Sequence, residues 1–394
     1  MEFKTFDIVP HGTKFDFVGK RHIAVVLSLV VNLAVILWSI PAIHGLNFGV
    51  DFAGGTEMEV KFAQAVDAGD IRKGVEALGF TDASVQTYGA TTENTYLIRV
   101  GRVALMTDAD VQRVVEAVKK AGLPLTSSSF NAEFGDKIDL QFATPPTVAQ
   151  LRQVVESAGV RVREVREEQG ITAGSKSFAI ITQGIRDQIE RDLGARFGEA
   201  KPEVRRVEYV GPAVGRELRN QGFKAIIYAM ALIVVYVGLR FDFKFAPGVI
   251  IALIHDAVVT LGYFAFSGRE FNLTSIAVIL TVVGYSVNDT VVVYDRIRET
   301  LAKYKGKTLA EIVNISINDV LGRTFLTSFA TALSLVGLLV YGVGTIFDFS
   351  MAMLFGIISG TYSTWFIAAP MTIWLETRAH TKPAAAAAAA RAAK

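Results

Sequence analysis

Polar side chains that could carry out chemistry lie inside long apolar stretches of this sequence. The stretch 272–294 contains Thr281, Tyr285, Asn288 and Asp289, and this spacing places all four on one face of a helix. An ionisable side chain at membrane depth is costly and usually serves a purpose. Asp289 is therefore a candidate for taking up and releasing a proton inside a membrane.

A second polar stripe runs through a later apolar stretch, residues 324–344. Arg323 opens this stretch, and hydroxyl side chains recur along one side of it: Thr324, Thr327, Ser328, Thr331 and Ser334. If the two stretches cross in opposite directions, Asp289 and Arg323 lie at similar depth and can pair. Burial favours the neutral form of a carboxyl group, whereas a nearby guanidinium favours the ionised form. Asp289 would therefore take up a proton when the pair separates and release it when the pair forms again. The alternative is a static ion pair that joins two helices.

Two further features lie at membrane depth. His255 and Asp256 are adjacent within the apolar stretch 246–266, and they form either a helix-packing hydrogen bond or a branch of the proton path. The last apolar stretch carries a ladder of small residues, which indicates close helix packing rather than a site: Gly356, Ser359, Gly360, Ser363 and Thr364.

Six stretches approach the roughly 20 apolar residues that a helix needs to cross a membrane. They cover residues 22–44, about 223–239, 246–266, 272–294, 324–344 and 350–375, with a tight link around 347–348 between the last two. The chain is 51% hydrophobic but also 20% charged, which indicates spanning segments combined with a soluble domain. We therefore expect transmembrane helix 1 at 22–44 and helices 2–6 within 221–376.

The distribution of Lys and Arg predicts the orientation. They concentrate in residues 1–21, in the links after the second and fourth stretches, and just after the sixth. We expect both termini in the cytoplasm and the domain between 45 and 222 outside. The first stretch has no small-residue cleavage site near Pro41, so it reads as a retained anchor. The tail 377–394 is rich in alanine and is expected to be a cytoplasmic tether without an assigned function.

The outside domain carries an internal repeat. A strand pattern at 57–62 precedes a helix pattern at 68–78, and the same order returns at 137–142 and 150–159. Residues 70–79 and 150–159 share Arg, Val, Glu and Gly at matching positions. Further strands at 83–87, 96–100, 177–182 and 203–210, with helices at 108–121 and 185–197, complete two similar units, and Thr107 is a plausible N-cap. This predicts an α+β domain of two tandem ferredoxin-like units, 45–125 and 126–220.

Several classes of function are disfavoured. The formal net charge of +2 points to no nucleic-acid partner, and the absence of cysteine excludes disulfides and thiolate metal sites. Gly306-Lys307-Thr308 ends like a phosphate-binding loop, but Leu301 stands where the leading glycine should be. No residue set in the outside domain looks catalytic. We expect no enzymatic activity, no metal and no cofactor, with protons as the coupling ion.

Three sequence stretches carry a family resemblance. They are residues 45–56 (GLNFGVDFAGGT), 210–218 (VGPAVGREL) and 283–299 (VGYSVNDTVVVYDRIRE), and His255-Asp256 and Arg323-Thr324 also match in place. The sequence resembles the SecF family of protein translocase subunits, which belongs to the RND superfamily. The resemblance implies a bacterial inner-membrane protein that pairs with SecD beside the SecYEG channel. It further implies that Asp289 and Arg323 belong to a proton path and that the outside domain grips unfolded preprotein.

One departure from the family concerns that outside domain. SecF usually carries a single compact αβ unit there, and this chain carries two in the repeat described above. Which unit contacts SecD or preprotein is therefore open.

The resulting hypothesis is a motor driven by the proton motive force. Protonation of Asp289 weakens its pairing with Arg323, the helices shift and the outside domain swings. Hinges are expected at glycines that flank the domain: Gly45, Gly49, Gly54, Gly55, Gly211 and Gly215. The alternative is that these glycines only form turns. The rival functions are half of an RND-type exporter of small molecules or lipids, and a purely structural scaffold.

Overall fold

The computed structural model describes residues 13–88, 93–132, 136–169, 176–241 and 246–374. The chain divides into two compact units, one formed by residues 1–47 and 221–394 and the other by residues 48–220. We call the first the membrane unit and the second the αβ domain. The expected tail 377–394 lies outside the described residues.

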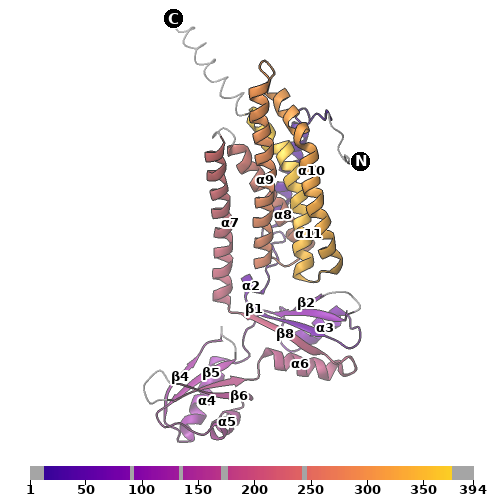
Figure 1. Cartoon of the computed structure of the whole chain (residues 1–394). Helices are drawn as coiled ribbons and strands as arrows, with labels where there is room; N and C mark the ends of the chain where they lie inside the picture. The colour runs from indigo at the N-terminus through magenta and orange to yellow at the C-terminus, as the bar shows by residue number, and fades with distance from the viewer. Residues whose placement is uncertain (1–12, 89–92, 133–135, 170–175, 242–245, 375–394) are drawn as a thin grey trace, which may run out of the picture. The chain divides into compact units, whose positions relative to one another are not determined.

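The membrane unit contains six helices long and apolar enough to cross a bilayer, within the described residues. They are α1 (Arg21–Trp38), α7 (Pro212–Arg240), α8 (Ala246–Ser267), α9 (Leu273–Lys303), α10 (Leu309–Tyr341) and α11 (Thr345–Ser363), which continues through a π turn (Thr364–Ala368) to Trp374. Figure 1 shows α8, α9, α10 and α11 side by side. The prediction of six transmembrane helices is confirmed.

Two predicted boundaries of these helices are wrong. The helix α10 begins at Leu309 rather than at 324, because Thr308 and Glu311 form a capping box and because Ile312, Val313 and Ile317 pack inward. A search for continuous apolar sequence misses this amphipathic first part. The link between α10 and α11 is at residues 342–344, and Asp348 lies inside α11.

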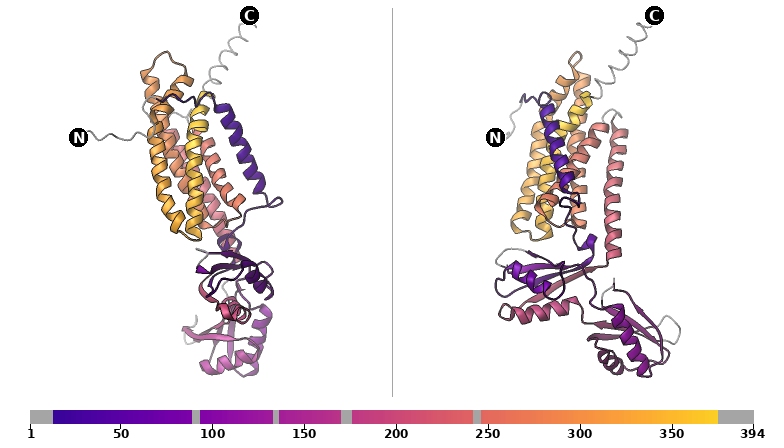
Figure 2. Two further views of the ribbon diagram at one scale, coloured as in Figure 1. Left: turned by 90° about the vertical axis from the view of Figure 1, so that its right-hand side faces the viewer. Right: turned by 180° about the vertical axis from the view of Figure 1, so that it is seen from behind.

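The helix α1 packs along α8 and the C-terminal helix, as the indigo ribbon in Figure 2 shows. The Tyr362 hydroxyl donates to the carbonyl oxygen of Ala24 at 2.7 Å and accepts from Ser28 at 3.1 Å. Before α1, the Asn314 and Asn318 side chains of α10 bind the backbone of residues 15–18. The N-terminal half of α1 and the segment before it are therefore held by contacts distant in sequence.

The αβ domain contains two four-stranded antiparallel sheets. Sheet 1 has the order β2-β3-β1-β8 and sheet 2 has the order β4-β5-β7-β6. Sheet 1 consists of β1 (Gly55–Lys61), β2 (Ser84–Thr87), β3 (Thr95–Val100) and β8 (Glu203–Val210). Sheet 2 consists of β4 (Leu125–Phe130), β5 (Lys137–Phe142), β6 (Val162–Gln169) and β7 (Lys176–Thr182). Sheet 1 has the order of a ferredoxin-like βαββαβ unit, and sheet 2 has the same spatial order although its edge strand β4 comes first in the chain.

The helices of the αβ domain are α2 (Val50–Ala53), α3 (Ala68–Glu76), α4 (Asp108–Lys120), α5 (Val148–Ser157) and α6 (Ile185–Arg196). Thr107 caps α4 through a capping box with Asp110, which confirms the predicted N-cap. The turn of 3₁₀-helix at Gly198–Ala200 leads from α6 into β8.

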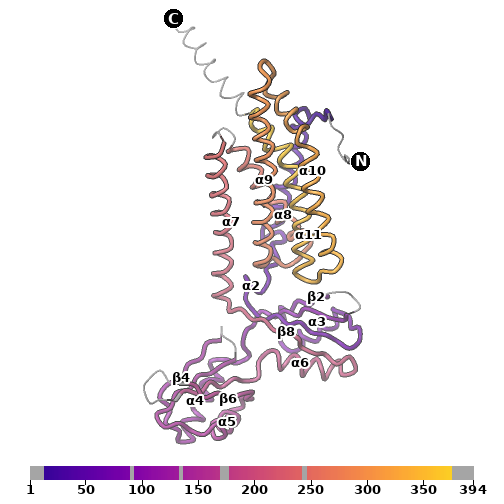
Figure 3. The backbone as a smooth tube through the Cα atoms, viewed as in Figure 1, coloured from indigo at the N-terminus to yellow at the C-terminus, as the bar shows by residue number. Residues whose placement is uncertain are grey.

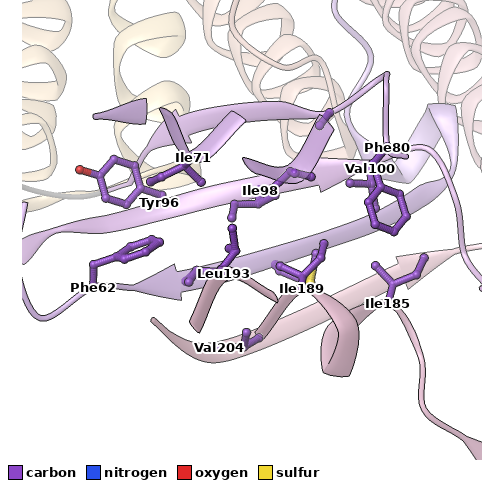
Figure 4. Packing of buried hydrophobic residues seen from close by; sticks show 14 of the residues in the cluster. Phe62, Ile71, Phe80, Tyr96, Ile98, Val100, Ile185, Ile189, Leu193 and Val204 are labelled. Carbon is purple, nitrogen blue, oxygen red and sulfur yellow. The ribbon is translucent and has the colours of Figure 1, made fainter. Parts of the chain in front are cut away.

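The two ferredoxin-like units exchange their last helix and strand. In the core of sheet 1, Ile185, Ile189 and Leu193 of α6 pack against Ile98 and other strand residues (Figure 4). In the core of sheet 2, Val114 and Val118 of α4 pack against Leu140 and Phe178. Each unit thus takes a helix and a strand from the other half of the sequence.

This exchange corrects the predicted division at residues 125 and 126. The chain passes from the sheet 1 unit to the sheet 2 unit after β3 and returns after β7, and the tube in Figure 3 follows this path. The repeat predicts two similar units. However, the two copies have the same pattern of apolar residues, so a helix and strand from either copy can pack on either sheet. Local pattern alone therefore does not decide which sheet α4 and α6 cover.

Candidate functional site

Asp256 lies at the centre of a buried hydrogen-bond cluster in the membrane unit. It lies on α8 with 0% of its surface exposed. Its Oδ2 accepts from Ser286 of α9 at 2.6 Å and from Ser363 of α11 at 2.7 Å. Its Oδ1 accepts from Ser359 of α11 at 2.8 Å and lies 3.0 Å from His255 Nδ1. One carboxyl group thereby joins three helices.

Close packing makes this cluster possible. A Cβ on Gly360 would lie 2.9 Å from the Cβ of Ser286, and one on Gly356 would collide with Val282. The small residues of α11 therefore let α9 approach closely, as the sequence predicts. Ser359 and Ser363 combine this close packing with hydrogen bonds to Asp256.

A row of hydroxyl groups continues along α9 beyond this cluster. Thr290 contacts Thr364 of the π turn at 2.9 Å, and the Tyr294 hydroxyl donates to the carbonyl oxygen of Ala368 at 3.0 Å. A π turn leaves backbone carbonyls without their usual helical partners and often occurs at functional sites. Here the Tyr294 side chain of α9 donates to one carbonyl of the turn, and Thr290 contacts a hydroxyl group of the turn.

Asp289 has the opposite surroundings. It is also buried on α9, at 3% exposure, but its Oδ2 has no hydrogen-bond partner among the described residues. Thr324 of α10 is likewise buried, and its Oγ1 has no partner among them. Ser328 lies close to Asp289 but shares its hydroxyl with Thr361 at 2.8 Å. An under-satisfied carboxyl group is therefore held between α9 and α10.

Arg323 does not complete this site as expected. Its side chain is exposed on α10, while the next residue, Thr324, occupies the buried side. Arg323 is near enough to act on Asp289 electrostatically, but the described part of the chain shows no ion pair between them. The predicted direct pairing is absent from this structure, because successive residues of a helix point about 100° apart.

Besides the approach of Ser328 to Asp289, the two predicted stripes meet at a second place. Thr331 donates to the Tyr285 hydroxyl at 3.3 Å, which links α10 to α9. Four other stripe residues are exposed in the isolated chain: Thr281, Asn288, Thr327 and Ser334. The stripe on α9 is therefore split between an inner side with Asp289 and an outer side with Asn288.

Two of the predicted hinge glycines, Gly54 and Gly215, lie at closely packed positions. Gly54 has a φ of +78°, and a Cβ there would lie 2.8 Å from the Cα of Pro212 at the start of α7. A Cβ on Gly215 would lie 3.1 Å from the backbone nitrogen of Gly54. Gly45 and Gly55 also have positive φ, whereas Gly49 and Gly211 do not. These contacts explain the need for glycine, and hinge motion stays a prediction.

Two family models match the chain. The C-terminal model of the SecD/SecF protein export membrane proteins matches residues 191–378, and the SecD/SecF GG motif matches residues 40–66. A protein translocase subunit SecF from Magnetococcus marinus is 36% identical, with 95% of this chain and 96% of the relative covered. SecF subunits from Koribacter versatilis (34% identical, 95% of each chain) and Rickettsia prowazekii (32% identical, 97% of each) are also similar.

The chain belongs to the SecF family of protein translocase subunits.

Solved structures agree with this membership. The crystal structure of SecDF from Thermus thermophilus, a translocon-associated membrane protein, matches with a TM-score of 0.65 and 27% identity over 93% of this chain. A SecDF structure in a super-membrane-facing form matches with a TM-score of 0.57 and 26% identity over 95% of this chain. This SecF-family chain spans 39% and 40% of those two longer chains.

The family membership bears on the exporter alternative. This protein is a SecF subunit of the Sec translocase, a multi-pass membrane protein that works in the context of SecD. The relatives at this identity are translocase subunits, so nothing supports the alternative of half an RND-type exporter of small molecules or lipids.

Sequence reasoning did not assign three serines to the Asp256 cluster. Ser286, Ser359 and Ser363 all donate to Asp256. Ser286 lies one position from Tyr285 and falls outside the predicted stripe. One signal was available: Ser359 and Ser363 are four residues apart and share a helical face.

Proposed function

We propose that this SecF-family chain, together with SecD, couples proton flow to the late export of unfolded preprotein beside the SecYEG channel. The chain lies in the bacterial inner membrane with both termini in the cytoplasm, and the αβ domain is outside. The Lys and Arg distribution supports this orientation. Asp289 binds and releases the proton.

The observation that supports this role is the contrast between the two buried aspartates. Asp256 receives hydrogen bonds on both oxygens, and an ionised carboxylate, which only accepts, satisfies all of these donors. Asp289 has an oxygen without a partner, so a proton can be added there without breaking a hydrogen bond. Asp256 therefore positions α8, α9 and α11, and Asp289 changes its protonation.

The exposed polar residues of α9 and α10, with Arg323 among them, support a SecD-binding surface on these two helices. An exposed guanidinium at membrane depth is costly unless another chain or water receives it. Asn288 and Thr327 are exposed on the same two helices. A SecD helix on this side would cover these residues. The surroundings of the Arg323 charge would then depend on how SecD and this chain pack together.

The energy available to such a motor is sufficient. One elementary charge that crosses the membrane field releases about 2.3 kcal/mol per 100 mV. This biases a conformational equilibrium by more than about tenfold. A shift of α9 against α10 on protonation of Asp289 then reaches the αβ domain through α7, which runs without interruption from Pro212 to Arg240.

The test is export into vesicles that contain SecYEG, SecD and either wild-type chain or Asp289→Asn. We expect Asp289→Asn to abolish the gradient-dependent part of export, because the amide cannot take up the proton, while assembly with SecD is retained. Asp295→Asn, an exposed aspartate on the same helix, is the matched control and should export normally. Normal gradient-dependent export by Asp289→Asn would contradict the proposal.

A further inference from the structure

The strand β4 forms an edge of sheet 2 (Figure 1). It pairs with β5 on one side, and Thr126, Ser127, Ser128 and Ser129 are exposed. Within the described part of the chain, these four residues make no backbone hydrogen bond outside that pairing. The outer N–H and C=O groups of β4 are therefore available to another extended chain.

The other three sheet edges are protected in ways that β4 is not. The strand β6 carries five charged side chains, Arg163, Glu164, Arg166, Glu167 and Glu168. The strand β8 carries Glu203, Arg205, Arg206 and Glu208, and β2 has only four residues. Charge and short length are the usual means of blocking edge-to-edge pairing. The strand β4 is six residues long and has no charged side chain.

The geometry of β4 keeps its edge extended. The register with β5 shifts between Leu125 and Ser127, which is a bulge. Because a bulge adds one residue, Leu125 and Phe130 both reach the core of sheet 2 although strict alternation would place them on opposite faces. These two anchors hold the strand at its ends, and the serines between them stay accessible.

We propose that β4 binds a segment of unfolded client polypeptide as an added β-strand. Pairing through main-chain hydrogen bonds tolerates many sequences, which suits a site that must accept varied chains. The small hydroxyl side chains of β4 impose little steric selection on the neighbouring strand. A strand of this length spans about 20 Å and holds about six client residues. The choice of a client polypeptide as the bound strand rests on the proposed function. The availability of the β4 edge rests on the fold alone.

The first test measures binding of a peptide to the full-length chain in detergent. A labelled 12-residue peptide of alternating Val and Thr is compared with the same peptide N-methylated at each of its six central residues, which blocks both edges of the strand. We expect N-methylation to weaken binding by about tenfold or more, because two or three main-chain hydrogen bonds are lost. Equal affinity of the two peptides would overturn strand addition, and the protein is unchanged in this comparison.

The second test locates the peptide, and the absence of cysteine from the chain makes it direct. Single cysteines at Thr126, Ser127, Ser128 and Ser129 are crosslinked to a peptide with one central cysteine. We expect crosslinking to alternate along the strand, because successive side chains point to opposite faces. Ser157→Cys, an exposed serine on α5, is the matched control and should not crosslink. Crosslinking at Ser157 equal to that at β4 would overturn the location.

A third comparison separates this inference from its alternatives. The double variant Ser127→Lys, Ser129→Lys should bind the peptide about tenfold or more weakly, while Ser157→Lys binds like wild type. Disulfide-linked dimers of Ser128→Cys without peptide capture would show that a second copy occupies the edge, which would overturn the client assignment. Peptide binding needs neither SecD nor a gradient, so its outcome is independent of the export assay on Asp289.

Discussion

Two aspartates on neighbouring helices show how surroundings decide what a buried carboxyl group can do. The Asp256 carboxyl receives hydrogen bonds from α9 and α11 as well as from its own helix. Asp289 is nearly as buried but is left with an unpartnered oxygen. The same side chain therefore acts as a structural joint in one place and as a candidate proton carrier in the other.

Asp256→Asn should destabilise the membrane unit by about 3 kcal/mol, because an amide cannot accept from all the donors around it and leaves buried hydroxyl groups unpaired. The measurement is the free energy of unfolding in detergent. Asp295→Asn, which changes an exposed carboxylate, should alter it by less than about 0.5 kcal/mol. A loss no larger than that of the control would contradict the structural role of Asp256.

Asp136 provides a residue-scale prediction in the αβ domain. Its carboxylate accepts from the backbone nitrogens of Leu105 and Met106, at 2.7 and 2.8 Å, just before α4. Burial raises the pKa of Asp136 above its ordinary value of 3.8, the two backbone N–H groups act against this rise, and the charge of Asp187 adds to it. The folded state therefore holds a proton more tightly than the unfolded state does.

It follows that the contribution of Asp136 to stability is fully present below about pH 3.8 and is lost as the pH rises through its raised pKa. The measurement is hydrogen exchange of β5 amides in the full chain between pH 4 and 7, corrected for intrinsic rates. We expect the protection of wild type to fall with rising pH and that of Asp136→Asn to change less. Equal slopes in the two proteins would refute this assignment.

At the scale of elements, the exchange of helices and strands is the main finding in the αβ domain. The helix α6 follows sheet 2 in sequence but covers sheet 1, and α4 follows sheet 1 strands but covers sheet 2. The stability of each sheet therefore depends on side chains from the other half of the domain sequence. Figure 4 shows this for Ile189 and Leu193, which pack among the strands of sheet 1.

Ile189→Ala and Val114→Ala distinguish this arrangement from two consecutive units. Ile189 is fully buried on α6, and its truncation should cost about 3 kcal/mol in sheet 1. Val114→Ala on α4 should cost about 2 kcal/mol in sheet 2. Hydrogen exchange followed by mass spectrometry should show faster exchange in β1 and β3 for the first variant and in β5 and β7 for the second. Consecutive units would give the reverse pattern.

At the scale of the whole molecule, the isolated chain leaves polar groups exposed on spanning helices. Arg323, Asn288 and Thr327 lie on the outer side of α9 and α10, where a lipid environment is unfavourable for them. The apolar residues exposed on α7, such as Leu232, need no partner in a bilayer. The difference between these two surfaces predicts which one contacts SecD.

Single cysteines test this surface without removing native ones, since the chain has none. Asn288→Cys and Thr327→Cys should crosslink to SecD in membranes that contain both proteins. Leu232→Cys, which is 70% exposed on α7, should not. Crosslinks from Leu232 alone would place SecD against α7 instead. The exposure of Arg323 would then no longer support a SecD-binding surface on α9 and α10.

The sequence by itself determined the six spanning helices, the repeated αβ pattern, the N-cap Thr107 and the family, because hydropathy, helical phase and motifs are properties of neighbouring residues. Only the tertiary structure decided that α4 and α6 exchange sheets, that Arg323 is exposed beside a buried Thr324, and that Ser286, Ser359 and Ser363 meet at Asp256. Those serines lie 30, 103 and 107 residues from Asp256 in the chain. Contacts over such separations depend on which helix faces pack together, and the same local pattern is compatible with several packings.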